Sequence, residues 1–233
     1  MNVAIIPARG GSKRIPRKNI RDFCGIPMIA WSIRAASASG CFERIIVSTD
    51  DEEISSIALE HGAEVPFRRP AELSSDTATT SPVIHHALAW IQRNSGVRPI
   101  RACCLYATAP FVQASDIKRG LALLSSSDAD FAFTVTSFDF PIQRAVRVDA
   151  GGRVGMLYPE HYSTRSQDLE PAYHDAGQFY WGKSDAWLAE QPIFDSRSLA
   201  IQIPHFRAQD IDCEDDWRRA ELMFRALQQE CGA

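Results

Sequence analysis

Apolar runs that alternate with amphipathic segments are the feature that most constrains the fold of this chain. Four short apolar runs, many of their residues β-branched, predict buried strands at residues 3–6, 44–49, 101–106 and 130–136. Between them, apolar residues recur three and four positions apart, which predicts helices starting near residues 28, 52, 82 and 115. Strands that alternate with helices form a parallel sheet covered on both faces. The sequence therefore predicts an α/β fold with a doubly wound, mostly parallel sheet.

This alternation stops at Ser137, and an irregular insertion follows from residue 138 to residue 175. Residues 145–148 and 153–157 flank a turn with two glycines and predict a β-hairpin inside the insertion. Strand-like sequence returns at 177–182 and 199–203, and a last helix is expected at 212–228. A long irregular segment in a compact domain is usually a lid, a binding loop or an arm that contacts a partner. We expect a single domain over residues 1–233 with such an arm.

The composition excludes several classes of protein. The chain has a net charge of −4 and a pI near 5.9, which argues against a nucleic-acid binder that relies on bulk charge. No apolar run approaches the ~20 residues needed to cross a membrane. A first strand at residue 2 leaves no room for a signal peptide, so we expect a cytoplasmic protein. The six cysteines lack Cys-x-x-Cys spacing and indicate reduced thiols, with Cys103 and Cys104 on opposite faces of one strand.

A basic loop follows the first strand. It combines Gly10, Gly11 and Ser12 with five cationic side chains and no acidic residue; the cations are Arg9, Lys13, Arg14, Arg17 and Lys18. Glycine lets backbone N–H groups turn toward a ligand, and the clustered cations repel one another unless an anion is bound. The alternative is an exposed basic surface loop. The spacing matches neither the Gly-x-x-x-x-Gly-Lys-Ser/Thr nor the Gly-x-Gly-x-x-Gly motif. The loop predicts a polyphosphate site.

Two carboxylates near the carboxyl end form a candidate Mg²⁺ site. Asp210 and Asp212 are separated by one residue, so in an extended segment both side chains point the same way. Hard oxygen ligands with room for water and phosphate suit Mg²⁺. The alternative is structural: Asp212 also fits a helix N-cap, with Asp215 in the capping-box position.

Polar residues in and beside the insertion form a third candidate set. Gln143, Arg144, Arg165 and Gln167 lie in the insertion, and arginine suits bidentate recognition of a carboxylate. The alternative for each arginine is a solvated surface charge. Residues 175–177 predict a tight polar turn before an aromatic strand.

These motifs together resemble those of the CMP-sugar-acid synthetases, a family of cytidylyltransferases. The similar stretches occur in order along nearly the whole chain; they are 8–13 with Pro16, Lys18 and Asn19, then 46–50, 69–73, 76–78 and 210–212. Within the family, residues 10–16, 140–144 and 173–182 most resemble members that act on pseudaminic acid.

The resemblance implies a nucleotide-diphospho-sugar transferase type of fold and a reaction between CTP and a nine-carbon 2-keto sugar acid. The products would be the CMP-sugar and pyrophosphate. The implied nucleotide site comprises Ala8, Arg9, Gly10, Gly11, Ser12, Lys18, Asn19, Arg69 and Thr80, of which Arg9, Ser12 and Lys18 hold the triphosphate. The implied sugar site comprises Tyr106, Thr108, Gln143, Arg144, Arg165, Gln167 and Asp175.

The resemblance also implies the catalytic centre and the assembly. Asp210 and Asp212 would bind Mg²⁺ and act in catalysis with Arg9 and Lys18. The insertion at 138–175 would reach a second subunit in a homodimer.

One departure from the family bears on the substrate. Sialic acid synthetases commonly have Gln where this chain has Tyr106, in the stretch 106–110. The change favours a nonulosonic acid other than N-acetylneuraminate, with pseudaminic acid expected first. Legionaminate, N-acetylneuraminate and 3-deoxy-manno-octulosonate remain alternatives, as does a non-catalytic nucleotide-binding module.

Overall fold

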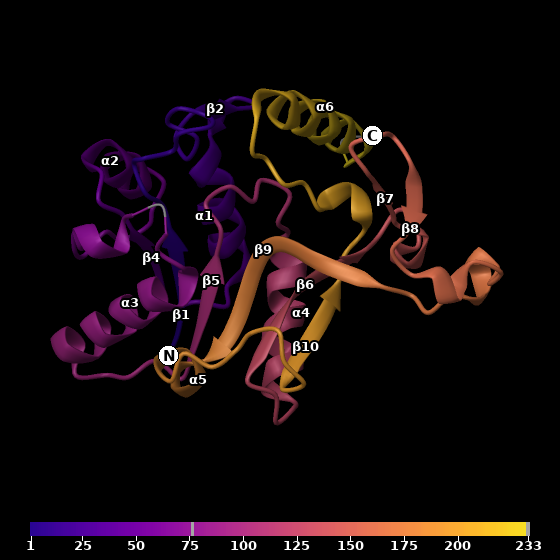
Figure 1. Cartoon of the computed structure of the whole chain (residues 1–233). Helices are drawn as coiled ribbons and strands as arrows, with labels where there is room; N and C mark the ends of the chain where they lie inside the picture. Colours follow the sequence, from indigo (N-terminus) through magenta and orange to yellow (C-terminus); the bar gives the residue numbers. More distant parts are fainter. Residues whose placement is uncertain (76, 232–233) are drawn as a thin grey trace.

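A central six-stranded sheet organises the computed structural model, which describes residues 1–75 and 77–231 (Figure 1). Asp76, part of one motif noted above, lies outside the described residues, and so does the side chain of Cys231. The strands, in their order across the sheet, are β10 (Ser198–Gln202), β6 (Phe131–Ser137), β9 (Tyr173–Lys183), β5 (Arg101–Leu105), β1 (Asn2–Pro7) and β4 (Arg44–Ser48).

The strand directions confirm a mostly parallel sheet. β1 pairs in parallel with β4 and β5, and β6 pairs in parallel with β10. Only β9 in this sheet runs the other way, between β5 and β6. The carboxyl ends of the parallel strands therefore meet at one edge, which is where ligands bind in sheets of this kind.

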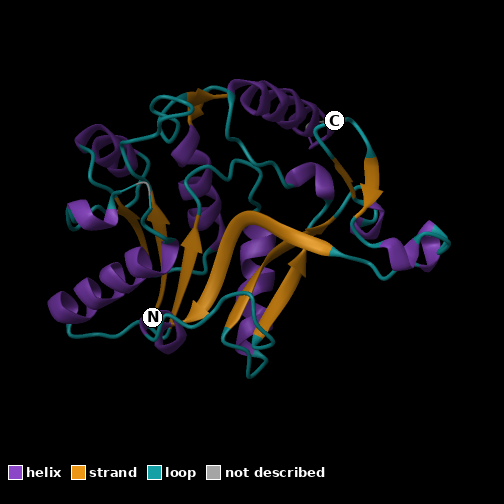
Figure 2. Ribbon diagram, in the orientation of Figure 1, coloured by secondary structure: helices purple, strands orange, loops and turns teal. Residues whose placement is uncertain are grey.

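Helices cover both faces of the sheet, as the alternation predicts (Figure 2). One apolar core packs against α1 (Met28–Ser39), α2 (Glu52–Glu60) and α4 (Ala114–Ser125). The opposite core packs against α3 (Thr80–Ser95) and α5 (Ser184–Leu188). Cys103 belongs to the first core and Cys104 to the second, so the predicted opposite orientation of these neighbours is confirmed. Both are free thiols.

β9 is bent, and the tight turn predicted at residues 175–177 is wrong. Residues 175–177 are not a turn before the strand, because β9 already begins at Tyr173. Tyr180 pairs with Phe133, but Asp175 pairs with Val135, so the strand takes up extra residues between these pairs. Gly177 lies in this irregular stretch with φ of 61°, a left-handed conformation that glycine adopts without strain. The bend carries Asp175 toward the ligand edge of the sheet.

The last helix, α6 (Glu214–Cys231), packs on the segment that follows the basic loop. The ring of Trp217 meets that of Phe23 edge to face, with centroids 5.4 Å apart, and Arg21 stacks 4.5 Å above Trp217. This third apolar cluster includes Ile211, so it brings Asp210 and Asp212 beside the basic loop. The two segments are nearly two hundred residues apart in the sequence.

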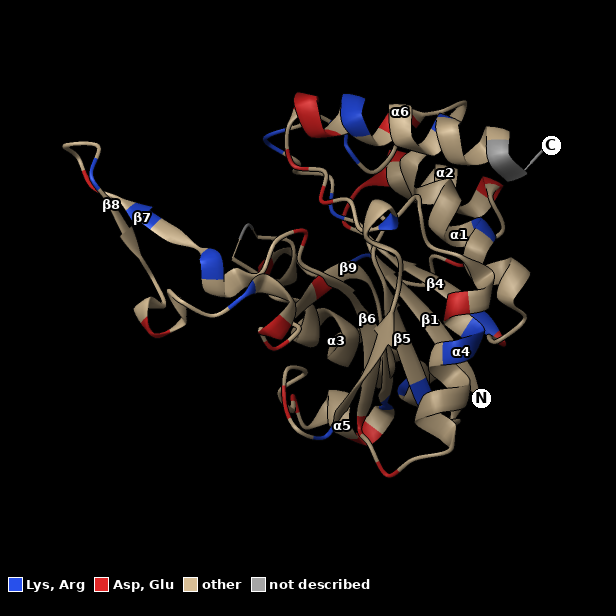
Figure 3. Ribbon diagram, turned by 90° about the vertical axis from the view of Figure 1, so that its right-hand side faces the viewer, with Lys and Arg blue, Asp and Glu red and all other residues tan. Residues whose placement is uncertain are grey.

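The insertion leaves the body of the protein as an arm (Figure 3). The predicted hairpin is present as β7 (Val146–Val148) and β8 (Val154–Met156). The rest of the arm contains 3₁₀ helices that are too short to show a period: η2 (Ile142–Arg144), η3 (Pro159–His161) and η4 (Ser166–Asp168). The other short elements are β2 (Asp22–Phe23), β3 (Ile26–Pro27), η1 (Ala71–Leu73) and η5 (His205–Arg207).

Among residues 1–75 and 77–231, no helix has the length and apolar character that crossing a membrane requires.

Candidate active site

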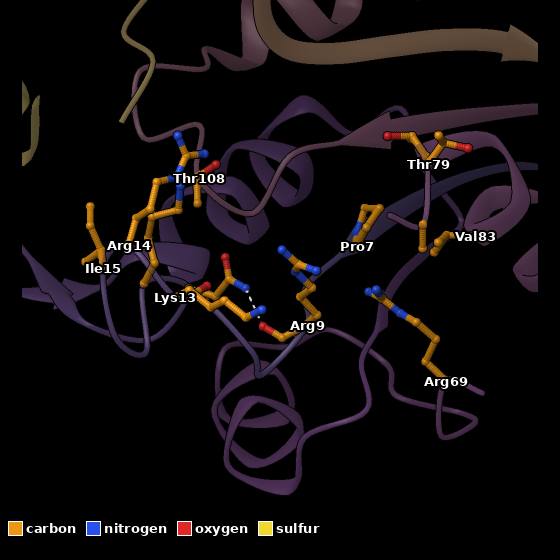
Figure 4. A pocket seen from close by; sticks show the side chains of 14 residues that line it. Pro7, Arg9, Lys13, Arg14, Ile15, Arg69, Thr79, Val83 and Thr108 are labelled. Atoms are coloured by element: carbon orange, nitrogen blue, oxygen red, sulfur yellow. Dashed lines mark hydrogen bonds between the residues drawn. The ribbon is translucent and has the colours of Figure 1, made fainter. Parts of the chain in front are cut away.

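A cavity of about 260 Å³ opens beyond the carboxyl end of β1 (Figure 4). It collects residues from the basic loop, from the segment after α2 and from the start of α3. Of the predicted nucleotide site, the lining includes Arg9, Ser12, Lys18, Asn19, Arg69 and Thr80. Lys13 and Arg14 also line it. The cavity is thus strongly cationic in a chain whose net charge is negative.

Arg69 is the buried cation of this cavity. Its side chain points toward that of Arg9 in Figure 4, and the residue is only 5% exposed. The pKa of Arg69 is lowered to about 10, mainly by burial; the charge of Asp50 acts to raise it and that of Arg9 to lower it. The guanidinium donates from Nε to the Ser48 hydroxyl at 3.1 Å and from Nη2 to the Ser48 carbonyl. A buried arginine that is held by neutral oxygens retains charge for an incoming anion.

The basic loop is fastened to the start of α2. The N–H of Gly10 donates to Asp50 Oδ1 at 3.0 Å, and Arg17 forms a bidentate pair with Asp51 at 2.6 and 2.9 Å. Arg17 also contacts Glu53. Carboxylates distant in sequence therefore neutralise Arg17, which does not line the cavity.

A second cavity of about 470 Å³ adjoins the first, since Thr108 lines both. Tyr106, Asp175 and Asp210 line it as well. A chain of contacts runs along this boundary: Tyr180 donates to Asp175 Oδ2, the rings of Tyr180 and Tyr106 are 5.4 Å apart, and the Tyr106 hydroxyl is 3.4 Å from that of Thr80. Burial raises the pKa of both phenols, so both remain protonated.

Of the two predicted metal ligands, Asp210 lines the second cavity and Asp212 lines neither cavity. Asp212 accepts hydrogen bonds from Arg14 at 2.7 Å and Lys18 at 3.5 Å, which line the first. Burial raises the pKa of Asp210, and the charge of Asp212 raises it further. The negative charge of Asp212 therefore disfavours that of Asp210, an arrangement that a divalent cation stabilises.

The structural alternative for Asp212 is wrong. Asp216, rather than Asp212 or Asp215, accepts hydrogen bonds at the start of α6, from the N–H groups of Asp212 at 3.1 Å and Cys213 at 3.0 Å. The Asp212 carboxylate is instead turned to the cations of the loop. Within the described residues, no group of three or more His, Cys, Asp or Glu forms a ready metal cage.

Several predicted residues lie outside both cavities. Ala8 is buried in the core, and Gly10 and Gly11 are not part of either lining. In the arm, Arg144 donates to the carbonyls of Tyr162 and Thr164, and Gln143 donates to that of Glu170. Arg165 pairs with Asp168, and Gln167 is exposed. Within one chain, these four arm residues do not reach the cavities.

Sequence reasoning also missed residues that line the cavities. Thr79, His174, Gly177 and Gln209 are among them. Thr79 could have been predicted from the sequence, because it stands next to Thr80 in a polar run before a helix. His174, Gly177 and Gln209 reach the second cavity through the bend of β9 and the path of the chain before α6, neither of which has a local sequence pattern.

Comparison with known proteins places the chain in a family. A family model described as cytidylyltransferase matches residues 3–230. The pseudaminic acid cytidylyltransferase of Campylobacter jejuni is 44% identical over 224 residues, 96% of each chain. An N-acylneuraminate cytidylyltransferase of Streptococcus agalactiae is 34% identical over 92% of this chain and 51% of its own length.

Solved structures agree on the fold. CMP:2-keto-3-deoxy-manno-octonic acid synthetase, solved in complex with CTP, superposes with a TM-score of 0.70 at 16% identity and covers 97% of this chain and 99% of its own. At that identity the likeness shows the fold alone. The family match over nearly every residue, together with the relatives above, shows that the chain belongs to the cytidylyltransferase family.

Proposed function

We propose that this protein transfers CMP from CTP to the 2-hydroxyl of pseudaminic acid and releases pyrophosphate. The observation that carries the reaction is the junction of two cavities at Thr108, one cationic and one lined by Tyr106, Asp175 and Asp210, with Asp212 bonded to two cations of the first. The choice of sugar is supported by the relative named for pseudaminic acid, which is 44% identical.

The cationic cavity suits the triphosphate and nucleoside of CTP. Arg9, Ser12 and Lys18 would hold the triphosphate, since they line the cavity together. Arg69, Asn19 and Thr80 line the same cavity and would contact the ribose and the cytosine. Asn19 is itself fixed by a 3.0 Å hydrogen bond from its side chain to the Arg9 carbonyl.

Asp210 and Asp212 would hold Mg²⁺. The donor set fits, because two carboxylates leave the remaining coordination positions to phosphate oxygens and water, as Mg²⁺ prefers. When bound, the ion supplies charge stabilisation and lowers the pKa of a coordinated hydroxyl.

The protein's own residues would act mainly by position and charge. The 2-hydroxyl oxygen forms a bond to the α-phosphorus while the bond from that phosphorus to the bridging oxygen of pyrophosphate breaks. Arg9 and Lys18 stabilise the negative charge that builds on the leaving pyrophosphate. The second cavity would hold the sugar acid and is called the sugar cavity below. Asp210 lines it and is the candidate acceptor for the hydroxyl proton.

A panel of sugar acids tests the assignment. Purified protein would be given CTP, Mg²⁺ and, in turn, pseudaminic, legionaminic, N-acetylneuraminic and 3-deoxy-manno-octulosonic acids, with pyrophosphate release as the readout. We expect the highest kcat/KM with pseudaminic acid. Preference for another acid would contradict the choice of sugar, and CTP binding without turnover of any acid would contradict the reaction.

The arm supports a further part of the proposal, a homodimer. Apolar side chains on the arm are unusually exposed; they include Phe140 at 80%, Tyr162 at 79%, Val154 at 68% and Val148 at 63%. Exposed apolar surface of this kind favours a protein partner. A second copy would cover it and would bring Gln143, Arg144, Arg165 and Gln167 toward the neighbour's sugar cavity, which they do not reach in one chain.

Sedimentation of the wild type and of a Val148→Asp/Val154→Asp variant tests the dimer. We expect a wild-type dimer and a folded monomeric variant with a raised KM for the sugar acid. A wild-type monomer would remove this part of the proposal and leave the reaction unaffected. Because CTP is a cytoplasmic nucleotide, the proposal also places the enzyme in the cytoplasm.

A further inference from the structure

The segment between β10 and α6 carries Asp210 and Asp212, and a buried ion pair fixes its middle. Arg207 donates to the carboxylate of Asp116 in the first turn of α4, and the two side chains are only 8% and 4% exposed. The other oxygen of Asp116 lies 3.3 Å from Arg119. Neither Asp116 nor Arg207 has a role in the reaction proposed above.

A second contact holds the same residue through its main chain. Gln178, in β9 and 3% exposed, donates from its side-chain amide to the Arg207 carbonyl at 2.7 Å. The carbonyl of Gln178 in turn accepts the N–H of Tyr106 at 2.9 Å, and its neighbour Gly177 lines the sugar cavity. Arg207 is thus tied on one side to α4 and on the other to the wall of the sugar cavity.

These contacts limit where the carboxylates can lie. The segment leaves the sheet at Ile203, whose N–H donates to the Val135 carbonyl at 2.9 Å and whose carbonyl accepts from Thr136 at 3.0 Å. Arg207 is only three residues before Asp210, so the chain between them spans at most about 10 Å. With both Ile203 and Arg207 fixed, little freedom is left to the position of Asp210.

Stability alone does not explain a buried ion pair at this position. The cost of removing two charges from water roughly cancels their attraction, and apolar residues of similar volume are often as stable. In some proteins a buried charge pair serves instead to select one arrangement of the chain, and we infer that role for this pair.

We propose that Asp116, Arg207 and Gln178 form a clamp that positions Asp210 and Asp212 for the divalent cation. They are positioning residues, since they act through the backbone that carries the carboxylates. The proposal rests on the function proposed above and adds to it the residues that align its metal site.

The test replaces both charges together. In the double variant Asp116→Leu/Arg207→Met, no buried charge is left without its partner, and we expect thermal unfolding close to that of the wild type. Binding of Mn²⁺ in the presence of CTP, measured from the electron paramagnetic resonance signal of free Mn²⁺, should weaken about tenfold or more, as expected when residues that orient metal ligands are lost. The Mg²⁺ concentration for half-maximal pyrophosphate release should rise in parallel.

A second ion pair serves as the control. Asp130 and Arg197 pair at the opposite end of the sheet, before β6 and β10. The variant Asp130→Leu/Arg197→Met should leave Mn²⁺ binding unchanged. Equal weakening in this control would attribute the effect to general loosening and overturn the clamp.

Two further outcomes distinguish failure of the clamp from failure of the proposed function. A folded double variant with wild-type Mn²⁺ affinity and Mg²⁺ dependence would overturn the clamp while wild-type activity upholds the proposed function. A wild type that releases no pyrophosphate would instead overturn the proposed function.

If the double variant does not fold, Gln178→Met removes the bond to Arg207 without touching a charge. Weakened Mn²⁺ binding in that variant then supports the clamp, and unchanged binding overturns it.

Discussion

The ion pair between Arg17 and Asp51 holds the basic loop, and its removal is the perturbation whose size is best defined. The hydrogen bond from Arg17 is the main cause that lowers the pKa of Asp51 to about 2 from 3.8. Asp51 also caps α2, because its Oδ1 accepts from the N–H groups of Glu53 and Ile54 at 3.0 Å. Asn caps a helix about as well as Asp. The substitution Asp51→Asn therefore removes the ion pair and retains the cap.

The shift in pKa sets the expected loss of stability. Each pKa unit corresponds to about 1.4 kcal/mol, so a carboxyl lowered this far contributes about 2 kcal/mol at neutral pH. Solvent screens part of this, because the Arg17 side chain is 38% exposed, and part of the shift comes from the cap hydrogen bonds that Asn retains, so a loss of about 1–2 kcal/mol is expected. Glu53, which is 67% exposed, contacts the same arginine. Glu53→Gln is the matched control and should cost well under 1 kcal/mol.

The sign of the pH dependence follows from a lowered pKa. The contribution of Asp51 is fully present above the ordinary carboxyl pKa and is lost as the pH falls through about 2. Urea unfolding of wild type and Asp51→Asn, compared at each pH, cancels the titration of the other carboxylates. The difference should be constant near neutral pH and shrink between about pH 4 and about pH 2. A difference that does not change with pH, or that equals the Glu53→Gln value, would refute this reasoning.

The same ion pair links stability to the proposed nucleotide site. Arg17 has φ of 56°, a left-handed conformation that costs a non-glycine residue about 1–2 kcal/mol. Its contacts with Asp51 offset that cost and hold the backbone next to Lys18, which lines the cationic cavity. Release of Arg17 in Asp51→Asn should therefore raise the KM for CTP as well as lower stability.

Three other substitutions test the proposed site, each scored by pyrophosphate release. Asp212→Ala should lower turnover about 10²-fold or more, as expected for a lost metal ligand, and near-normal turnover in saturating Mg²⁺ would contradict the metal assignment. Arg69→Lys should raise the KM for CTP about tenfold, since lysine cannot make both contacts with Ser48 and still face the ligand; an unchanged KM would place CTP elsewhere. Tyr180→Phe removes the donor to Asp175 and should raise the KM for the sugar acid about tenfold while leaving that for CTP unchanged; an equal rise in both would mean general damage.

The parts of the fold that rest on local patterns could be predicted from the sequence. The run at 3–6 became β1, and Gly40, in a left-handed conformation, ends α1 as expected of a glycine stop. The place of β9 between β5 and β6 could not be predicted, because strand order depends on contacts between segments far apart in the chain. α5 was missed because a helix of five residues is too short to show a period.

The candidate site, like the fold, could be predicted from the sequence only in part. Its cations are adjacent in the sequence, and their composition alone indicates an anion site. Their partners are not adjacent: Arg17 pairs with Asp51, and Arg14 and Lys18 share Asp212 nearly two hundred residues later. The loop therefore looks unneutralised in the sequence and is partly neutralised in the fold.

This neutralisation bears on how the ligands of the proposed reaction would arrive. A triphosphate that binds Arg14 and Lys18 competes with Asp212 for these cations, and a divalent cation competes with them for Asp212. Either ligand alone leaves one partner of a close charge pair without its counter-ion, which costs free energy. Both ligands together exchange one set of neutral pairs for another. Under the proposed function, the structure thus favours binding of CTP and the divalent cation as a unit, so that CTP affinity should fall when the cation is removed by a chelator.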